Sequence, residues 1–424
     1  MDRRKFLHHA TLSTAALPFL GQTASAKTKP LSATGRSHLS GEAYWKELRK
    51  EFPMPANEAY FNTGTMGAQP TRVLNAVIEN MRANVVDIAK CDYQGNGPLL
   101  LQGYQGFDSL REKIAQLINA RDYKEIALTQ NATMGMNYVS GGLDFQPGDE
   151  FINTNQEHGG GFGGWRTAAK RYGLTYKEAT IPVPANDPQE IFDNIFDLVT
   201  PQTRVIAVPH ILSVYGVVLP VKEICAEARR RGIFTIIDGA QAVGQVKVDV
   251  QEMGCDAYYS SLHKWLLAPA GNGILYVRKE VVDEVWTVAA SYQWDNSDDH
   301  GLRLTQRGTG NISLIVGLEA AVDFHNEIGS DKVIKRIKEL GDYLRAGLQE
   351  MDKVKIVSSV HPEMCAGITT YQVEGISPVD LQNTMWKQHK LQPRAAGNSG
   401  LRQSTHIYNH KEEIDKALEV IKTI

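Results

Sequence analysis

Between residues 105 and 280, short apolar runs alternate with stretches whose apolar residues recur at helical spacing. The runs are too short for helices and are rich in β-branched or aromatic residues, which predicts strands. They lie at residues 126–129, 150–154, 204–209, 233–238, 256–260 and 273–277. One intervening stretch, residues 221–231, reads as a helix that ends before Gly232. Strands alternating with helices predict an α/β fold with a mainly parallel sheet flanked by helices.

The pattern changes near residue 313, where long helical stretches become dominant. Helical spacing covers residues 313–327, 331–351, 378–389 and 411–424, and strand-like runs cover residues 354–358 and 368–373. We therefore predict a large domain over residues 61–305 and a smaller α+β C-terminal domain over residues 306–424. Residues 27–60 are predicted to form an N-terminal arm or linker, part of which joins the smaller domain.

The first 26 residues have the layout of a signal peptide. A basic start with Arg3 and Arg4 precedes a mildly apolar run, and small residues end the segment at Ala26. The paired arginines followed by Phe-Leu resemble a twin-arginine signal, which the twin-arginine export machinery uses for folded proteins. The alternative is an ordinary signal peptide. Because the apolar run is too short to span a bilayer, we expect cleavage near Lys27, a periplasmic or otherwise exported protein and no stable membrane anchor.

Composition excludes several classes of function. The 424 residues carry 45 Lys+Arg and 48 Asp+Glu, a formal net charge of −3. This balance argues against a nucleic-acid surface, which needs clustered positive charge. The 4 cysteines are scattered and form no CxxC pattern, so we expect no metal site of that kind.

Polar residues follow the predicted strands at the edge of the sheet where ligands gather in open α/β folds. Asp238 ends one buried apolar run, and Lys264 follows another between His263 and Trp265. A lysine in such semi-apolar surroundings can have a lowered pKa and act as a nucleophile. An Asp and a Lys at neighbouring strand ends suit pyridoxal 5'-phosphate (PLP), because the lysine binds the cofactor covalently and the Asp holds the ring nitrogen protonated.

Two further strand ends add weaker signals. Thr133 is predicted to cap a helix over residues 134–141, where backbone N–H groups and a hydroxyl could hold a phosphate. His158 could lie over a cofactor ring, although a lone His after a strand is more often a surface residue. The glycine-rich residues 159–164 are predicted to form a tight loop, with or without a ligand against its backbone.

The ordered motifs QEH (residues 156–158), DGAQ (residues 238–241) and SLHK (residues 261–264) resemble class V aminotransferases of PLP fold type I. The resemblance runs along nearly the whole chain after residue 60 and implies a seven-stranded sheet. Residues 263–269 (HKWLLAP) and 401–409 are most similar to the isopenicillin-N-epimerase-like branch.

The resemblance implies a role for each matching residue. Lys264 is the lysine that carries the cofactor and moves protons, Asp238 pairs with the ring nitrogen, and His158 stacks on the ring. The residues implied to contact the cofactor elsewhere are Ala132, Thr133, Ser213, Gln241, Ser261 and His263. Thr309 matches the threonine that reaches the phosphate of a neighbouring subunit, which implies a homodimer. Arg402 is implied to bind a substrate carboxylate, and Arg394 is a second candidate. Residues 62–67, beginning with Asn62, are implied to lie at the substrate entrance.

Two departures bear on the reaction. Cysteine desulfurases carry a nucleophilic Cys near the arginine region, whereas residues 394–402 contain none. Desulfurases also tend to have Asn where this chain has Ser213. We therefore expect a PLP-dependent enzyme that acts on an amino acid or a similar amine, of aminotransferase type. Epimerisation and β-elimination are the alternatives within the family, and a non-catalytic PLP-fold binding protein is the alternative outside catalysis.

Overall fold

The computed structural model describes residues 38–92, 99–100, 106–306 and 308–424. The predicted signal peptide, residues 1–26, lies outside these ranges. Within them, no helix combines the length and apolar character that crossing a membrane requires.

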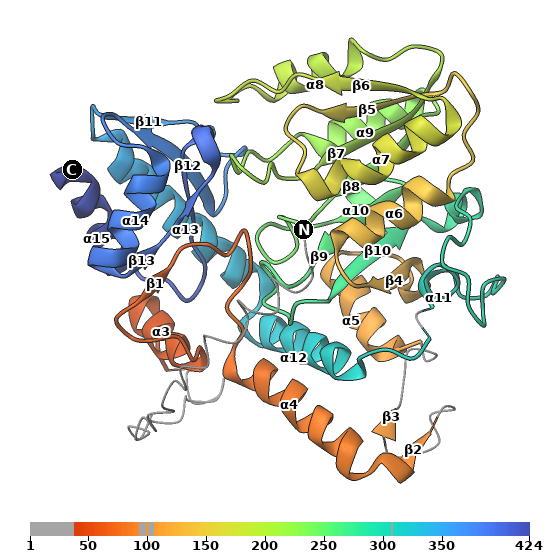
Figure 1. The fold of residues 1–424 in the computed structure, drawn as a ribbon, viewed down its shortest axis with the longest axis horizontal. Helices are drawn as coiled ribbons and strands as arrows, with labels where there is room; N and C mark the ends of the chain where they lie inside the picture. Colours follow the sequence, from red (N-terminus) through yellow and green to blue (C-terminus); the bar gives the residue numbers. More distant parts are fainter. Residues whose placement is uncertain (1–37, 93–98, 101–105, 307) are drawn as a thin grey trace, which may run out of the picture.

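The central element is a seven-stranded sheet, which confirms the sequence-based prediction of a mainly parallel sheet flanked by helices (Figure 1). Its strands in spatial order are β4 (Ile126–Thr129), β10 (Gly273–Val277), β9 (Ala257–Ser261), β8 (Phe234–Asp238), β7 (Thr203–Pro209), β5 (Glu150–Thr154) and β6 (Thr175–Ala179). β10 runs antiparallel to both of its neighbours, and the pairs from β9 to β6 are parallel. Because the parallel strands share one direction, their carboxyl ends meet at one edge of the sheet.

Both faces of the sheet are buried, which explains why its strands are almost continuously apolar. In β8, Ile237 belongs to the core on one face, and Phe234 and Ile236 belong to the core on the other. The first face is covered by α5 (Asp108–Leu117), α9 (Val221–Arg230), α10 (Val250–Met253) and α12 (Ile312–Ile328). The second face is covered by α6 (Ala132–Gly142), α7 (Gly159–Tyr172) and α11 (His300–Thr305). The short helix α8 (Pro188–Phe196) packs with the first core.

A second sheet of four antiparallel strands occupies the C-terminal part, as the predicted α+β pattern requires. Its order is β11 (Val354–Ile356), β12 (Ile368–Val373), β15 (Leu401–Ser404) and β14 (Arg394–Ala395). Its helices are α13 (Ser330–Gln349), α14 (Pro378–His389) and α15 (Lys411–Thr423). α4 (Thr71–Val86) packs along α12 (Figure 1), and a short pair, β2 (Cys91–Asp92) and β3 (Leu99–Leu100), follows it.

The described part of the predicted N-terminal arm is structured. Helix α3 (Gly41–Leu48) buries Tyr44, Trp45 and Leu48 in a core shared with Trp265, the residue after Lys264. Strand β1 (Ala59–Tyr60) pairs in parallel with β13 (Leu391–Gln392). The chain before the large sheet therefore packs with the C-terminal part of the molecule.

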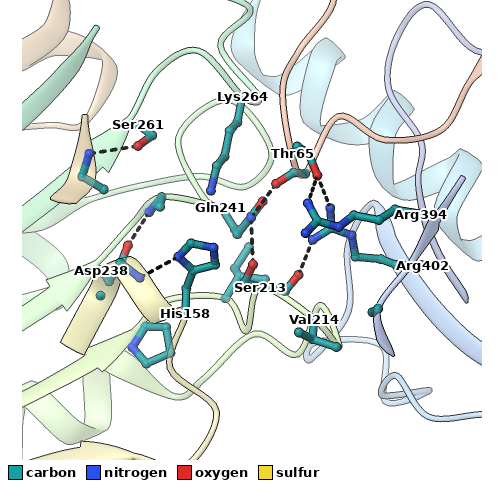
Figure 2. A pocket seen from close by; sticks show the side chains of 18 of the residues that line it. Thr65, His158, Ser213, Val214, Asp238, Gln241, Ser261, Lys264, Arg394 and Arg402 are labelled. Carbon is teal, nitrogen blue, oxygen red and sulfur yellow. Dashed lines mark hydrogen bonds between the residues drawn. The ribbon is translucent and has the colours of Figure 1, made fainter. Parts of the chain in front are cut away.

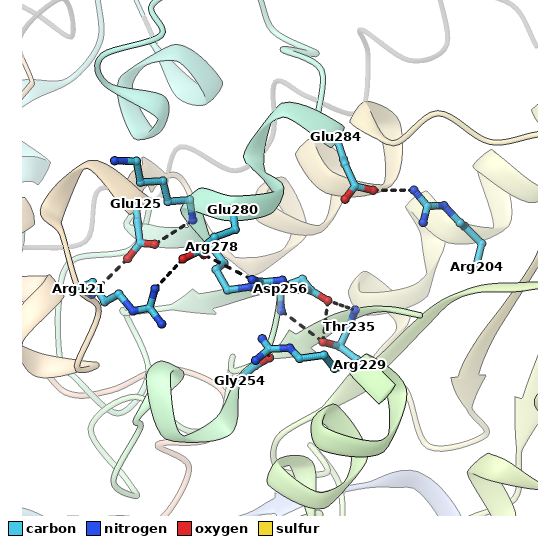
Figure 3. A network of polar contacts seen from close by, with 11 residues as sticks. Arg121, Glu125, Arg204, Arg229, Thr235, Gly254, Asp256, Arg278, Glu280 and Glu284 are labelled. Atoms are coloured by element: carbon cyan, nitrogen blue, oxygen red, sulfur yellow. Dashed lines mark hydrogen bonds and ion pairs between the residues drawn. The ribbon is translucent and has the colours of Figure 1, made fainter. Parts of the chain in front are cut away.

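At the other end of the parallel strands, where β8 and β9 begin, charged side chains connect neighbouring segments (Figure 3). Asp256, which precedes β9, accepts a 2.8 Å hydrogen bond from the Thr235 N–H at the start of β8. Its other oxygen pairs with Arg278 at 2.5 Å. Asp256 is 5% exposed, so leaving it without these partners would cost the desolvation of a buried charge. Charges at this end of the strands stabilise the fold, whereas those at the carboxyl ends surround a cavity.

Two local predictions are wrong. Residues 159–164 begin helix α7 rather than forming a loop, and a Cβ at Gly164 would lie 2.3 Å from Met136 Sδ. The glycines therefore permit α7 to approach α6 closely. Helix α6 begins at Ala132 instead of residue 134, and its N-cap is Asn131, whose Oδ1 accepts a 2.9 Å hydrogen bond from Met134 N–H. Thr133 lies inside the first turn because Asn131, two residues earlier, already caps the helix.

Candidate active site

A cavity of about 510 Å³ lies at the carboxyl ends of the parallel strands, between the large sheet and strands β14 and β15 (Figure 2). Residues from several strand ends and helix starts line it together. The predicted site residues among them are Ala132, Thr133, His158, Ser213, Asp238, Gln241, Ser261, His263, Lys264, Arg394 and Arg402. The structure therefore brings together residues that are up to 270 positions apart in the sequence, from 132 to 402.

Asp238 is the last residue of β8 and is 8% exposed. Its Oδ1 accepts a 2.8 Å hydrogen bond from Ala240 N–H, and Oδ2 lies against Gly161, where a Cβ would come within 3.0 Å. Burial raises the pKa of Asp238, while the Ala240 hydrogen bond and the Lys264 charge oppose that rise. Because burial makes the charged form of Asp238 costly, its second oxygen needs a proton or a cationic ligand.

Lys264 follows β9 in the turn after Ser261 and lines the same cavity (Figure 2). Burial lowers the pKa of its amine to about 8, and the positive charges of Arg402 and Arg394 add to this effect against the opposing attraction of Asp238. The Gly67 N–H donates to His263 O at 2.9 Å, so the entrance loop is bound to this turn. Near neutral pH, the amine of Lys264 is thus unprotonated in a far larger fraction of molecules than an ordinary lysine amine.

The pH dependence of Lys264 reactivity is testable in the apoprotein. Below pH 8 the rate of covalent PLP capture should rise about tenfold per pH unit, because the neutral amine is the nucleophile, and it should level off above pH 8. Stopped-flow absorbance measures this rate, with a lysine-containing peptide as the reference for titration of PLP itself. The peptide rate should keep rising toward its higher pKa, and a parallel rise in the protein would contradict the lowered pKa.

Groups suited to binding an anion lie where α6 begins. Ala132 N–H donates to Ser261 Oγ at 2.9 Å, which joins the helix start to the end of β9. Thr133 is exposed to the cavity, and the buried His263 Nδ1 has no hydrogen-bond partner among the described residues. Backbone N–H groups at a helix start together with hydroxyl and imidazole groups are suited to a phosphate.

His158 is the N-cap of α7, and its Nδ1 accepts a 3.1 Å hydrogen bond from Gly160 N–H. Burial and the Lys264 charge lower its pKa, so the ring is neutral at physiological pH and carries its proton on Nε2.

Sequence reasoning missed Glu157, the residue before His158, whose pKa is raised to about 8 by burial and by Asp238. Its position in the QEH motif was the available signal.

The orientation of Gln241 is determined by Trp265, a second residue whose contact the sequence did not predict. Gln241 Oε1 accepts a 2.8 Å hydrogen bond from Trp265 Nε1. The amide nitrogen consequently donates, to Gly64 O at 2.8 Å and to Ser213 Oγ at 3.3 Å. Gln241 therefore presents N–H groups, rather than its carbonyl oxygen, beside the cavity.

Arg402 is 3% exposed and is fixed by three neighbours. It donates to Ser213 O at 2.7 Å, to Thr65 Oγ1 at 2.8 Å and to Asn62 Oδ1 at 3.0 Å. Arg394 donates to the same Thr65 hydroxyl at 2.7 Å (Figure 2). Asn62 thus contributes by holding Arg402 rather than by lining the cavity, and Thr65 is a site residue within the entrance segment predicted at residues 62–67.

Thr309 is exposed and does not line this cavity in the single chain described. Its assignment to the site of a neighbouring subunit, and the homodimer that this requires, remain predictions.

A mainly parallel seven-stranded sheet with a lysine and an aspartate at its strand ends is the arrangement of a PLP-dependent enzyme of fold type I. The family model "Aminotransferase class-V" matches residues 65–417. The chain belongs to the class V aminotransferase family.

Its relatives include enzymes of different activity. It is 28% identical over 400 residues to the isopenicillin N epimerase of Streptomyces clavuligerus, covering 90% of this chain and 98% of that protein. It is 30% identical over 414 residues to a probable cysteine desulfurase of Halalkalibacterium halodurans, covering 89% and 97%. Among solved structures, the cystine C-S lyase C-DES in complex with cysteine persulfide is 26% identical, with a TM-score of 0.76 over 87% of this chain and 98% of that one. A C-DES mutant of the same similarity carries glycine covalently linked to its PLP cofactor.

The residues of this chain fit PLP. The unpartnered His263 Nδ1 and the start of α6 suit its phosphate, and the buried Asp238 suits a protonated ring nitrogen. The lowered pKa of Lys264 suits capture of the cofactor aldehyde. PLP is therefore the cofactor of this enzyme.

Proposed function

We propose that this enzyme is an aminotransferase-type PLP enzyme for an amino acid with a free α-carboxylate. The observation that carries the proposal is the convergence of Lys264, Asp238 and Arg402 on one cavity whose described lining contains no thiol. Bound PLP supplies an electron-accepting ring that stabilises negative charge at the carbon next to the substrate nitrogen.

The side chains have separate tasks in this proposal. The buried guanidinium of Arg402 binds the α-carboxylate and orients the substrate, since its three neighbours prevent it from moving away. The Lys264 amine, neutral in part near pH 7, accepts the Cα proton and returns it at a second carbon. The Asp238 carboxylate keeps a proton on the ring nitrogen. His158, Ser213 and Gln241 position the cofactor ring.

The surroundings of the cysteines support this choice over persulfide chemistry. Cys365 is 5% exposed, forms a β-bridge with Val217 and lies outside the described lining of the cavity. Burial raises the pKa of Cys225 to about 12 and also raises that of Cys255. A thiol that attacks substrate sulfur needs access and thiolate character, and these three buried thiols lack the access.

β-Elimination is the second candidate, favoured by the similarity to the lyase C-DES. Elimination removes a β-substituent after the same Cα deprotonation by Lys264 and needs no thiol from the protein. Epimerisation, the activity of the isopenicillin N epimerase relatives, additionally needs an acid on the opposite face of the substrate. The proposed arrangement places His158 on that face, and its ring is neutral and therefore a poor acid, which disfavours epimerisation.

Product analysis tests the proposal. The holoenzyme is incubated with an amino-acid panel that includes cystine, with and without a keto-acid acceptor. Transamination should give more than one equivalent of the matching keto acid per active site only with the acceptor, to which the amino group is transferred. Ammonia and pyruvate formed without an acceptor would instead establish β-elimination, and inversion of Cα with no keto acid would establish epimerisation.

We also propose a homodimer and export. The exposed side chains Leu74, Ile78, Met81 and Val85 recur along one face of α4 and would be covered by a second copy. Thr309 of that copy would reach the cofactor phosphate, as the family resemblance implies. The paired Arg3 and Arg4 support export through the twin-arginine machinery to the periplasm, which would allow PLP to be bound before export.

A further inference from the structure

Arg394 and Arg402 face each other directly across the antiparallel strands β14 and β15. Side chains at opposed positions of such a pair project on the same side and lie close together. Like charges placed there destabilise the sheet. Both guanidiniums also donate to one oxygen, Thr65 Oγ1, at 2.7 and 2.8 Å. The described residues give neither of them a carboxylate partner.

The unused N–H groups of Arg394 and Arg402 show how many anionic groups the two arginines can bind. A guanidinium has five N–H donors. Arg402 uses three of these on Ser213, Asn62 and Thr65, and its buried Nε has no partner in the part of the chain that the structure describes. Of the two that remain, the Nε–H is buried, and one Nη1–H is left to donate to a carboxylate oxygen. Arg394 uses one donor on Thr65, and the four that remain can bind a separate carboxylate in bidentate fashion.

The charges around the cavity are also unbalanced toward positive. Among its described lining residues Asp238 is acidic, whereas Lys264, Arg394 and Arg402 are basic. Ser261, which accepts a hydrogen bond from the start of α6 and is suited to the cofactor phosphate, lies on the other side of the cavity from the two arginines (Figure 2). One substrate α-carboxylate would therefore neutralise one of the two guanidiniums and leave the other without a counter-ion.

We propose that the substrate carries two anionic groups, with Arg402 binding the α-carboxylate and Arg394 binding a carboxylate at the end of a short acidic side chain. This inference rests on the proposed function and adds the substrate class to it. Arg394 is exposed at the mouth of the cavity, so it can receive the distal carboxylate while the buried Arg402 holds the proximal one. Because both guanidiniums contact Thr65 Oγ1, the two carboxylates that they bind must lie close together, as they do in aspartate or glutamate.

The test compares each acid with its neutral isostere on the PLP-loaded enzyme. Dissociation constants for L-aspartate, L-asparagine, L-glutamate and L-glutamine are measured from changes in visible absorbance. At least one acid should bind about 10- to 100-fold more tightly than its amide, the range of a charge-assisted hydrogen-bonded pair. Arg394→Gln should abolish this preference and leave amide binding nearly unchanged, while Arg394→Lys should retain part of it. Arg204→Gln, at a surface arginine paired with Glu284, is the matched control and should have no effect.

Two results would overturn the inference. Equal binding of acids and amides by the wild-type enzyme would show that no second anion is recognised. Equal weakening of acids and amides by Arg394→Gln would show that both arginines bind the α-carboxylate.

A failure of the proposed function has a different signature, in which no amino acid changes the absorbance or yields product. In that case glutarate and its monoamide are compared by thermal stabilisation of the PLP-loaded protein. Greater stabilisation by glutarate that disappears in Arg394→Gln would still support the two-anion site, and equal stabilisation would contradict it.

Discussion

Lys264→Ala is expected to lower turnover by at least about a thousandfold, because it removes the amine that captures the cofactor and moves the substrate proton. The variant should also lose a borohydride-sensitive visible absorbance band that the wild-type holoenzyme shows. Mass spectrometry after borohydride reduction should place the cofactor on the peptide containing Lys264 in the wild-type protein.

Lys264→Ala should not destabilise the folded apoprotein. Burial lowers the pKa of Lys264, so its ammonium form is destabilised in the folded protein, and its removal should leave the free energy of unfolding unchanged or higher. Lys247→Ala, at an exposed lysine, is the control and should keep full activity. Wild-type turnover in Lys264→Ala, or cofactor attached to a different lysine, would contradict the assignment of the site.

Asp238→Asn should lower turnover by about 10² to 10⁴-fold, since an amide of the same shape cannot keep the ring nitrogen protonated. Burial raises the pKa of the Asp238 carboxyl, which means that its charged form is costly in the fold. By linkage, this cost increases as pH rises above the normal carboxyl pKa. At neutral pH, the free energy of unfolding of Asp238→Asn apoprotein should therefore equal or exceed that of the wild type.

Asp256→Asn, just before the neighbouring strand β9, provides the matched comparison (Figure 3). Asp256 pairs with Arg278 and accepts from Thr235 N–H, so its change should destabilise the fold by about 3 kcal/mol while the remaining folded enzyme stays active. Chemical denaturation and steady-state kinetics measure the two effects. Similar stability losses in both variants with equal activity losses would assign Asp238 a structural role.

Much of the site could be predicted because its residues lie at strand ends that the hydrophobic pattern marks. Asp238 ends an apolar run and Lys264 follows another, and parallel strands bring such ends to one edge. The local errors came from short-range features. Glycines at residues 159–164 argue against a helix until the close approach of α7 to α6 is known, and Asn131 and Thr133 are both acceptable caps by sequence.

Contacts between distant segments could not be predicted in this way. Thr65 joins Arg394 and Arg402 across more than 300 positions, and Trp265 orients Gln241 from another turn. Glu157 acquires its raised pKa from burial beside Asp238, a property of the packed site rather than of the QEH motif.

The sequence by itself determined the α/β architecture, the family and the cofactor, because periodicity and short motifs record local constraints on strands, helices and strand ends. Only the tertiary structure decided the electrostatics and the substrate-facing surface. The lowered pKa of Lys264 arises from its burial, and the opposed arginines arise from the register between β14 and β15. Both properties depend on which side chains exclude water from one another, and that arrangement exists only once the two sheets enclose the cavity.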